Sequence, residues 1–165
     1  MAKTGPVRVI YTCYGGTHSS PVAAAIHLGH LPRRRIPTAG QIMAVPLYDK
    51  IDGKSRGELF LAGKDRLGNE VYVLGRGRES ASTVARLIEG GLKLAGADVS
   101  WVLADTLPCV NGLMRLGGFL SRNVGLVTVG RPAVLLGTRL AYPRLVRLVE
   151  DVERRIQAGF AGPVI

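Results

Sequence analysis

The sequence is poor in cysteine and in aromatic residues, and it lacks long apolar runs. Two cysteines in 165 residues exclude a disulfide framework, and no CxxC pair indicates structural zinc or a redox dithiol. No apolar stretch is long enough to span a bilayer. The N-terminal residues lack the apolar core and cleavage site of a signal peptide. We therefore expect a cytoplasmic protein with no membrane partner.

Acidic residues are also scarce relative to basic ones, 12 against 22, which gives a formal net charge of +10. The basic excess is spread along the chain, and its densest cluster is Arg33–Arg35. Such a charge is compatible with nucleic-acid binding, but a dispersed excess favours an anionic small molecule as the partner. The composition leaves the cofactor and the oligomeric state unknown.

Predicted strands and helices alternate along the chain, which is typical of an α/β fold. We expect a single domain over residues 1–165, with a three-layer, Rossmann-like arrangement of a mostly parallel sheet and helices on both faces. Two short segments around Gly68-Asn69 predict a β-hairpin insertion. Strands are expected at 7–12, 58–61, 70–74, 99–104 and 126–129. Helices are expected at 21–28, 80–95, 111–120 and from 143 onward, with short turns near 41 and 48, and residues 132–138 fit either a strand or a helix.

Residues 13–20 read CYGGTHSS and join the first predicted strand to the first predicted helix. A junction of this kind aims backbone N–H groups and a helix N-terminus at one point, which suits a phosphate or another oxyanion. Cys13 is a candidate nucleophile, because a thiolate near a helix N-terminus is stabilised. His18 can pair with the thiolate or act as an acid or base. The predicted anion ligands in this loop are Gly15, Gly16, Thr17, His18, Ser19 and Ser20.

The same loop also allows a purely structural interpretation. Cys13 can simply end a buried strand, and the glycines can form a tight turn. Ser20 is a good helix cap, with Pro21 at the first helical position.

Two further strand ends carry candidate residues. Arg76 and Arg78 follow one strand and can supply a guanidinium to a bound anion. Asp105 ends another and is a candidate general acid, although its carboxylate can equally cap the next turn. If the three strands are parallel neighbours, the three loops share one rim of the sheet. No metal site is predicted, since no acidic residue or cysteine completes a ligand set with His27 and His30.

The loop has neither the spacing nor the lysine of a Walker A motif. It resembles the C-x5-R-S loop of low-molecular-weight tyrosine phosphatases, with Cys13 and Ser20 matching and Ser19 in place of the arginine that binds the phosphoryl group. It also resembles the phosphocysteine loop of phosphotransferase-system IIB components through Cys13, Gly16, Ser19 and Ser20, with His18 replacing a glycine. Together with the later segment AYPRLVRLVE, it resembles an uncharacterised bacterial family, a domain of unknown function that implies no activity.

Overall fold

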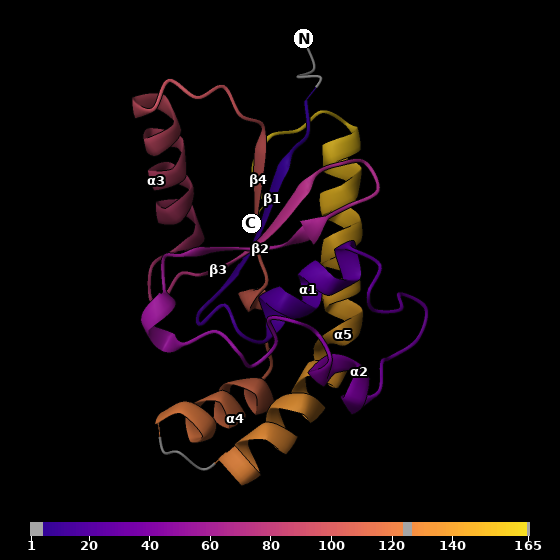
Figure 1. Ribbon diagram of the computed structural model, residues 1–165. Helices are drawn as coiled ribbons and strands as arrows, with labels where there is room; N and C mark the ends of the chain where they lie inside the picture. Colours follow the sequence, from indigo (N-terminus) through magenta and orange to yellow (C-terminus); the bar gives the residue numbers. More distant parts are fainter. Residues whose placement is uncertain (1–4, 124–126, 165) are drawn as a thin grey trace.

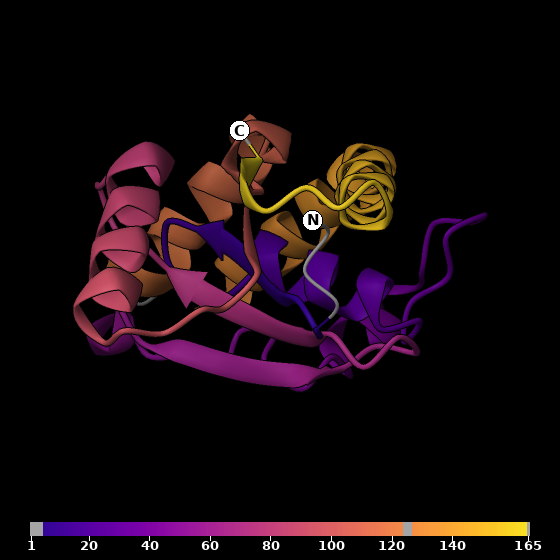
Figure 2. The same cartoon turned by 90° about the horizontal axis from the view of Figure 1, so that it is seen from above.

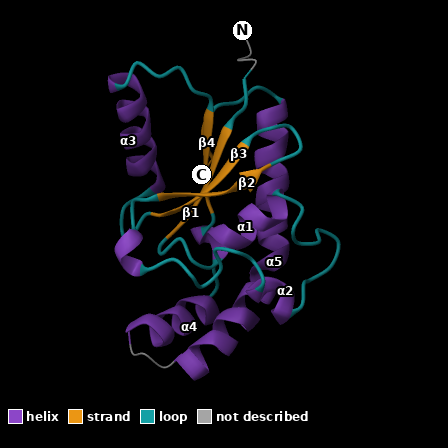
Figure 3. Cartoon of the chain, viewed as in Figure 1, coloured by secondary structure: helices purple, strands orange, loops and turns teal. Residues whose placement is uncertain are grey.

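The computed structural model describes residues 5–123 and 127–164. Five strands form one sheet in the order β2-β3-β1-β4-β5. Figure 3 shows strands in orange and helices in purple. The strands are β1 (Arg8–Cys13), β2 (Leu59–Lys64), β3 (Glu70–Gly75), β4 (Trp101–Asp105) and β5 (Gly162–Val164). β1 is parallel to both β3 and β4, β4 is parallel to β5, and β2 is antiparallel to β3. The expected α/β fold with a mostly parallel sheet is confirmed.

Helices cover both faces of this sheet (Figures 1 and 2). The helices are α1 (Ser19–His27), α2 (Ala39–Met43), α3 (Ala81–Leu94), α4 (Gly112–Asn123) and α5 (Val127–Gln157), with short 3-10 turns at Gly53–Ser55 and Leu107–Cys109. Of these, α1 and α5 pack on one face of the sheet and α3 on the other, while α4 packs against α5. Val9 and Tyr11 pack with α1 and α5, whereas Ile10 packs with α3 on the other face. Because side chains alternate along β1, the same pattern sets the face of the sheet toward which the residues at its carboxyl end point.

Helix α1 is the central helix of the larger core. All of its residues are buried, and its three consecutive alanines allow it to lie close to the sheet and to α5. The helix ends where the sequence predicts, because Gly29 follows with a φ of +75°. Because β1 and α1 are both packed in the core, the positions of the two ends of the loop between them are determined.

The β2–β3 hairpin is confirmed, and its turn contains Gly68 with a φ of +83°. β2 covers residues 59–64 rather than 58–61, and its pairing with β3 shifts register between Leu61 and Gly63. The hairpin places β2 at one edge of the sheet.

The strand expected at 126–129 is wrong for residues 127–129. Residue 126 lies outside the described residues, and Val127–Val129 begins α5, so the helix expected from Pro143 starts well before that residue. Residues 132–138 are helical, and both Pro132 and Pro143 lie inside α5. The β-branched run is typical of a strand, but packing against α4 overrides this preference.

Glycines permit that packing between α4 and α5. A Cβ at Gly117 would lie 2.8 Å from the Gly130 carbonyl oxygen, and one at Gly137 would lie 2.7 Å from Met114. The short strand β5 was not expected from the sequence, since its extended form depends on pairing with β4. Within the described ranges, none of the helices combines the length and apolarity needed to cross a bilayer.

Candidate functional site

The Cys13 thiol lies inside the loop that joins β1 to α1. The Gly16 N–H donates a hydrogen bond to Cys13 Sγ at 3.1 Å, and Ser20 Oγ lies 3.1 Å from the same sulfur. Cys13 as a whole is 6% exposed. A backbone N–H and the first turn of α1 therefore both face the sulfur.

Several backbone amides of the loop have no acceptor. The Gly16 N–H is used by the thiol, but for the amides of Gly15, Thr17, His18, Ser19 and Ser20 there is no hydrogen-bond acceptor within residues 5–123 and 127–164. Thr17, Ser19 and Ser20 are each at most 2% exposed. Buried N–H groups without a partner are rare and costly, so a cluster of them is a place where an oxyanion would be stabilised.

The loop hydroxyls are engaged within the protein. Thr106 Oγ1 donates to the Thr12 carbonyl at 2.9 Å, so its 2.8 Å contact with Ser19 Oγ is made by the Ser19 hydroxyl donating. His18 is the N-cap residue of α1, but its side chain makes no capping hydrogen bond to the helix. The backbone amides, rather than the serine hydroxyls, are therefore the donors left for a ligand.

The three predicted loops do share one rim of the sheet. The Arg76 N–H donates to the Cys13 carbonyl and the Gly77 N–H to the Tyr14 carbonyl, each at 2.9 Å. On the other side, the Thr106 N–H donates to the Thr12 carbonyl at 2.9 Å. The parallel pairing of β1 with β3 and β4 is what brings these loops together.

Arg76 and Asp105 form a buried ion pair at this rim. Arg76 Nη2 lies 2.8 Å from Asp105 Oδ2, and the two side chains are 8% and 10% exposed. Arg76 Nη1 also donates to the Glu79 carbonyl, and Asp105 Oδ1 accepts the Leu107 N–H. Arg76 Nε has no hydrogen-bond partner in the part of the chain that the structure describes. Arg78 is exposed in the same turn.

The ion pair and the thiol lie toward opposite faces of the sheet. Asp105 comes two residues after Leu103, which packs with α3. Cys13 comes two residues after Tyr11, which packs with α1 and α5. Since side chains alternate along a strand, the guanidinium bound to Asp105 is directed away from the face that carries the thiol.

A carboxylate that the sequence analysis missed lies beside His18. Asp49 Oδ1 is 3.4 Å from His18 Nε2, and Asp49 Oδ2 accepts a 2.8 Å hydrogen bond from Arg131 Nε of α5. The hydrogen bond with His18, together with that from Arg131, lowers the pKa of Asp49 to about 2. The Asp49 N–H donates to the Thr17 carbonyl at 2.8 Å. Nothing in the residues 46–50 marks this role, because it depends on tertiary contacts.

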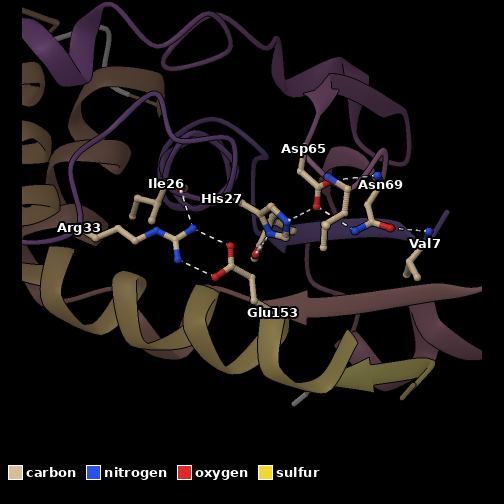
Figure 4. Close-up of polar contacts among 9 residues, drawn as sticks. Val7, Ile26, His27, Arg33, Asp65, Asn69 and Glu153 are labelled. Atoms are coloured by element: carbon tan, nitrogen blue, oxygen red, sulfur yellow. Dashed lines mark hydrogen bonds and ion pairs between the residues drawn. The ribbon is translucent and has the colours of Figure 1, made fainter. Parts of the chain in front are cut away.

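A second polar cluster surrounds His27 at the amino ends of β1 and β3 (Figure 4). His27 Nδ1 is 2.8 Å from the Tyr11 hydroxyl, and His27 Nε2 is 3.1 Å from Asp65 Oδ2. Burial raises the pKa of Asp65, but hydrogen bonds from Asn69, His27 and Leu67 outweigh it and lower that pKa below its ordinary value. Asp65 therefore accepts from His27 Nε2, and in a neutral imidazole Nδ1 is the nitrogen left to accept from Tyr11.

This cluster borders a cleft of about 380 Å³. Its polar groups are paired with one another: Asn69 binds both Asp65 and the Val7 N–H, and Arg33 binds both oxygens of Glu153 at 2.6 Å. The cluster joins the hairpin turn to α1 and β1, and the Arg33–Glu153 pair ties the segment after α1 to α5. We interpret it as structural.

The fold and the rim define an α/β protein with a cysteine-bearing loop at the carboxyl edge of its sheet. The profile of one family, "Protein of unknown function (DUF3189)", matches residues 8–154, and the chain belongs to this family. The expected resemblance to a family of unknown function is thereby confirmed. No curated protein and no solved structure gives a significant match. The resemblance to tyrosine phosphatases and IIB components is not supported by these comparisons.

Proposed function

We propose that the loop of residues 13–20 binds the phosphate group of a small molecule, or another oxyanion. The observation that carries this proposal is the cluster of five backbone amides without acceptors in the described structure, three of them on buried residues. An anion at the N-terminus of α1 would also be stabilised by the helix dipole. A cytoplasmic location remains part of the proposal, since it suits two unpaired cysteines.

In an enzymatic form of this proposal, Cys13 is the nucleophile. Its sulfur attacks phosphorus, the bond from phosphorus to the leaving oxygen breaks, and that oxygen receives a proton from His18. Water then attacks the phosphorus and gives a proton to His18, and the bond from phosphorus to sulfur breaks, which releases phosphate and the Cys13 thiolate. Asp105 was the acid expected from the sequence. Both of its oxygens accept hydrogen bonds here, so we assign the proton to His18.

The alternative is a binding or regulatory module that holds the anion without chemistry. Two observations favour it: Ser19 stands where phosphatase loops have arginine, and Arg76 is committed to Asp105. A nucleic-acid role is less well supported, since Arg33 is paired with Glu153 and Arg35 contacts Gln41. Weak, salt-insensitive binding to DNA or RNA would count against that role.

Binding is tested by following alkylation of Cys13 with iodoacetamide in the presence and absence of inorganic phosphate. We expect phosphate to slow modification of Cys13 and to raise the melting temperature. Burial raises the pKa of the Cys109 thiol, so Cys109 should react slowly and independently of phosphate, and a Cys109→Ser variant provides the matched control. If phosphate neither protects Cys13 nor shifts melting of a folded sample, the proposal is wrong.

Catalysis is tested separately with an aryl phosphate whose hydrolysis releases a coloured phenol. Cys13→Ser should keep phosphate binding but lose turnover, and Cys13→Ala should also lose turnover. Full turnover in both variants would rule out covalent catalysis. Phosphate binding without turnover in the wild-type protein would favour the non-catalytic module.

A further inference from the structure

The loop needs a cation if it is to hold a phosphate dianion, and the loop itself has none. Phosphate sites use an arginine or lysine to neutralise the charge of the bound group. Arg76, the cation expected from the sequence, is bound to Asp105 on the α3 side of the sheet. A cation on the same side as the thiol would come from the opposite face, where the Cys13 side chain lies.

Arg131 is the arginine that the tertiary structure brings to this face. It lies on α5, and its Nε is bonded to Asp49, which also contacts His18 at the start of α1. His18, Asp49 and Arg131 line one small crevice together with Tyr48. The Arg131 side chain is 52% exposed, against 15% for His18 and 13% for Asp49. Its bond to Asp49 uses Nε, and its Nη groups have no acceptor within the described ranges.

Asp49 lies between these two side chains and is bonded to both. Its φ is +55°, and it is the one residue other than glycine with positive φ in the part of the chain that the structure describes. Such a conformation persists only where surrounding contacts impose it, and here the Thr17 carbonyl accepts the Asp49 N–H. Tyr48, the preceding residue, packs edge-on against the His18 ring with centroids 5.3 Å apart, and its hydroxyl contacts Thr138 of α5 at 3.2 Å.

We infer that Asp49 is a positioning residue of the anion site, which holds His18 and Arg131 so that Arg131 supplies the cation that the loop lacks. The ligand class that fits is a phosphate monoester, because its dianion matches one guanidinium and a set of backbone amides. As an acceptor, the Asp49 carboxylate holds a proton on His18 Nε2 and so fixes the orientation of the ring. His18 Nδ1 is then directed to Thr17 Oγ1, 3.5 Å away, on the loop side. This inference rests on the proposed function.

Calorimetric titration with inorganic phosphate tests the role of Arg131. Arg131→Gln should weaken phosphate binding about tenfold or more, the loss typical of one charge-assisted contact. Arg139→Gln removes an exposed arginine from the same helix and should change the affinity less than twofold. If Arg131→Gln and Arg139→Gln bind phosphate equally well, the inference is wrong while the proposed function stands. If the wild-type protein does not bind phosphate, both fail.

The role of Asp49 is tested with Asp49→Asn, because asparagine tolerates positive φ and should preserve the fold. A carboxylate that acted only as a nearby negative charge would oppose the anion, so its removal would tighten phosphate binding. If Asp49 instead positions His18 and Arg131, Asp49→Asn should weaken phosphate binding severalfold. Imidazole ¹⁵N shifts should also change from a single Nε2–H tautomer of His18 to a mixture. Unchanged or tighter binding with an unchanged tautomer would overturn the assignment.

Discussion

The Tyr11 hydroxyl and His27 Nδ1 share a 2.8 Å hydrogen bond, and both side chains are buried. The pair joins the central strand to the end of α1, while Asp65 holds the other nitrogen of the ring. Tyr11→Phe removes the hydroxyl and leaves a buried nitrogen without its donor.

We expect Tyr11→Phe to lower the free energy of unfolding by about 1–3 kcal/mol, the cost of an unsatisfied buried acceptor. Urea denaturation gives the value. Tyr72→Phe is the matched control, because the Tyr72 hydroxyl binds Glu70 on a part-buried surface and its loss should cost less. If the two substitutions lower the free energy of unfolding equally, the buried Tyr11–His27 hydrogen bond contributes no more to stability than the part-buried one.

The close approach of the first loop to β3 gives a second prediction. A Cβ at Gly75 would lie 2.8 Å from the Gly15 carbonyl carbon and oxygen, and backbone cannot yield as a flexible side chain can. Gly75→Ala should therefore destabilise the protein by about 1–3 kcal/mol. Gly90 lies within α3 with open space around it, so Gly90→Ala should stabilise by up to about 1 kcal/mol. In thermal unfolding, Gly75→Ala should lower the melting temperature and Gly90→Ala should raise it.

The ion pair between Arg76 and Asp105 gives a third prediction. Asp105→Asn leaves a buried guanidinium without its counter-ion and should cost about 3–5 kcal/mol. Replacing both residues with neutral ones, as Arg76→Gln with Asp105→Asn, should cost less than Asp105→Asn alone. A double-mutant cycle from urea unfolding measures the coupling. A coupling near zero would mean that the pair is not the reason for the burial of either side chain.

The lowered pKa of Asp49 predicts how stability depends on pH. Its pKa is about 2 in the folded protein, against about 3.9 in an unfolded chain. A depressed carboxyl pKa contributes stability that is fully present above about pH 4 and is lost as the pH falls toward 2. The contribution at neutral pH is about 2 kcal/mol.

Asp49→Asn tests this dependence when unfolding is measured between pH 7 and pH 3. The difference in stability from the wild type should be largest at pH 7 and should shrink below pH 4. Asp52→Asn removes an exposed carboxylate three residues away, which caps a short turn, and should show a small difference. A stability difference for Asp49→Asn that is the same at every pH would contradict the assigned pKa.

The sequence correctly predicted those elements whose signals lie within the element itself or in its immediate neighbours. The β-branched run of β1, the Ser80-capped helix α3 and the turn around Gly68 need only nearby residues to form, and the structure contains each of them. The strand expected at 126–129 was wrong for residues 127–129, and the helix expected from Pro143 begins already at Val127. The β-branched residues and prolines of this region oppose a helix locally, and the helix forms because it packs against α4, closely at Gly117 and Gly137, and against α1.

The sequence by itself determined that a cysteine, two glycines and a helix start meet after the first strand, because this order is local along the chain. It also predicted that three loops would meet at one rim, because parallel strands end together. Only the tertiary structure decided which charged side chains accompany the thiol. Alternation along the strands directs Arg76 and Asp105 toward α3, while Asp49 and Arg131, 82 residues apart, meet beside His18 because α5 packs on the other face.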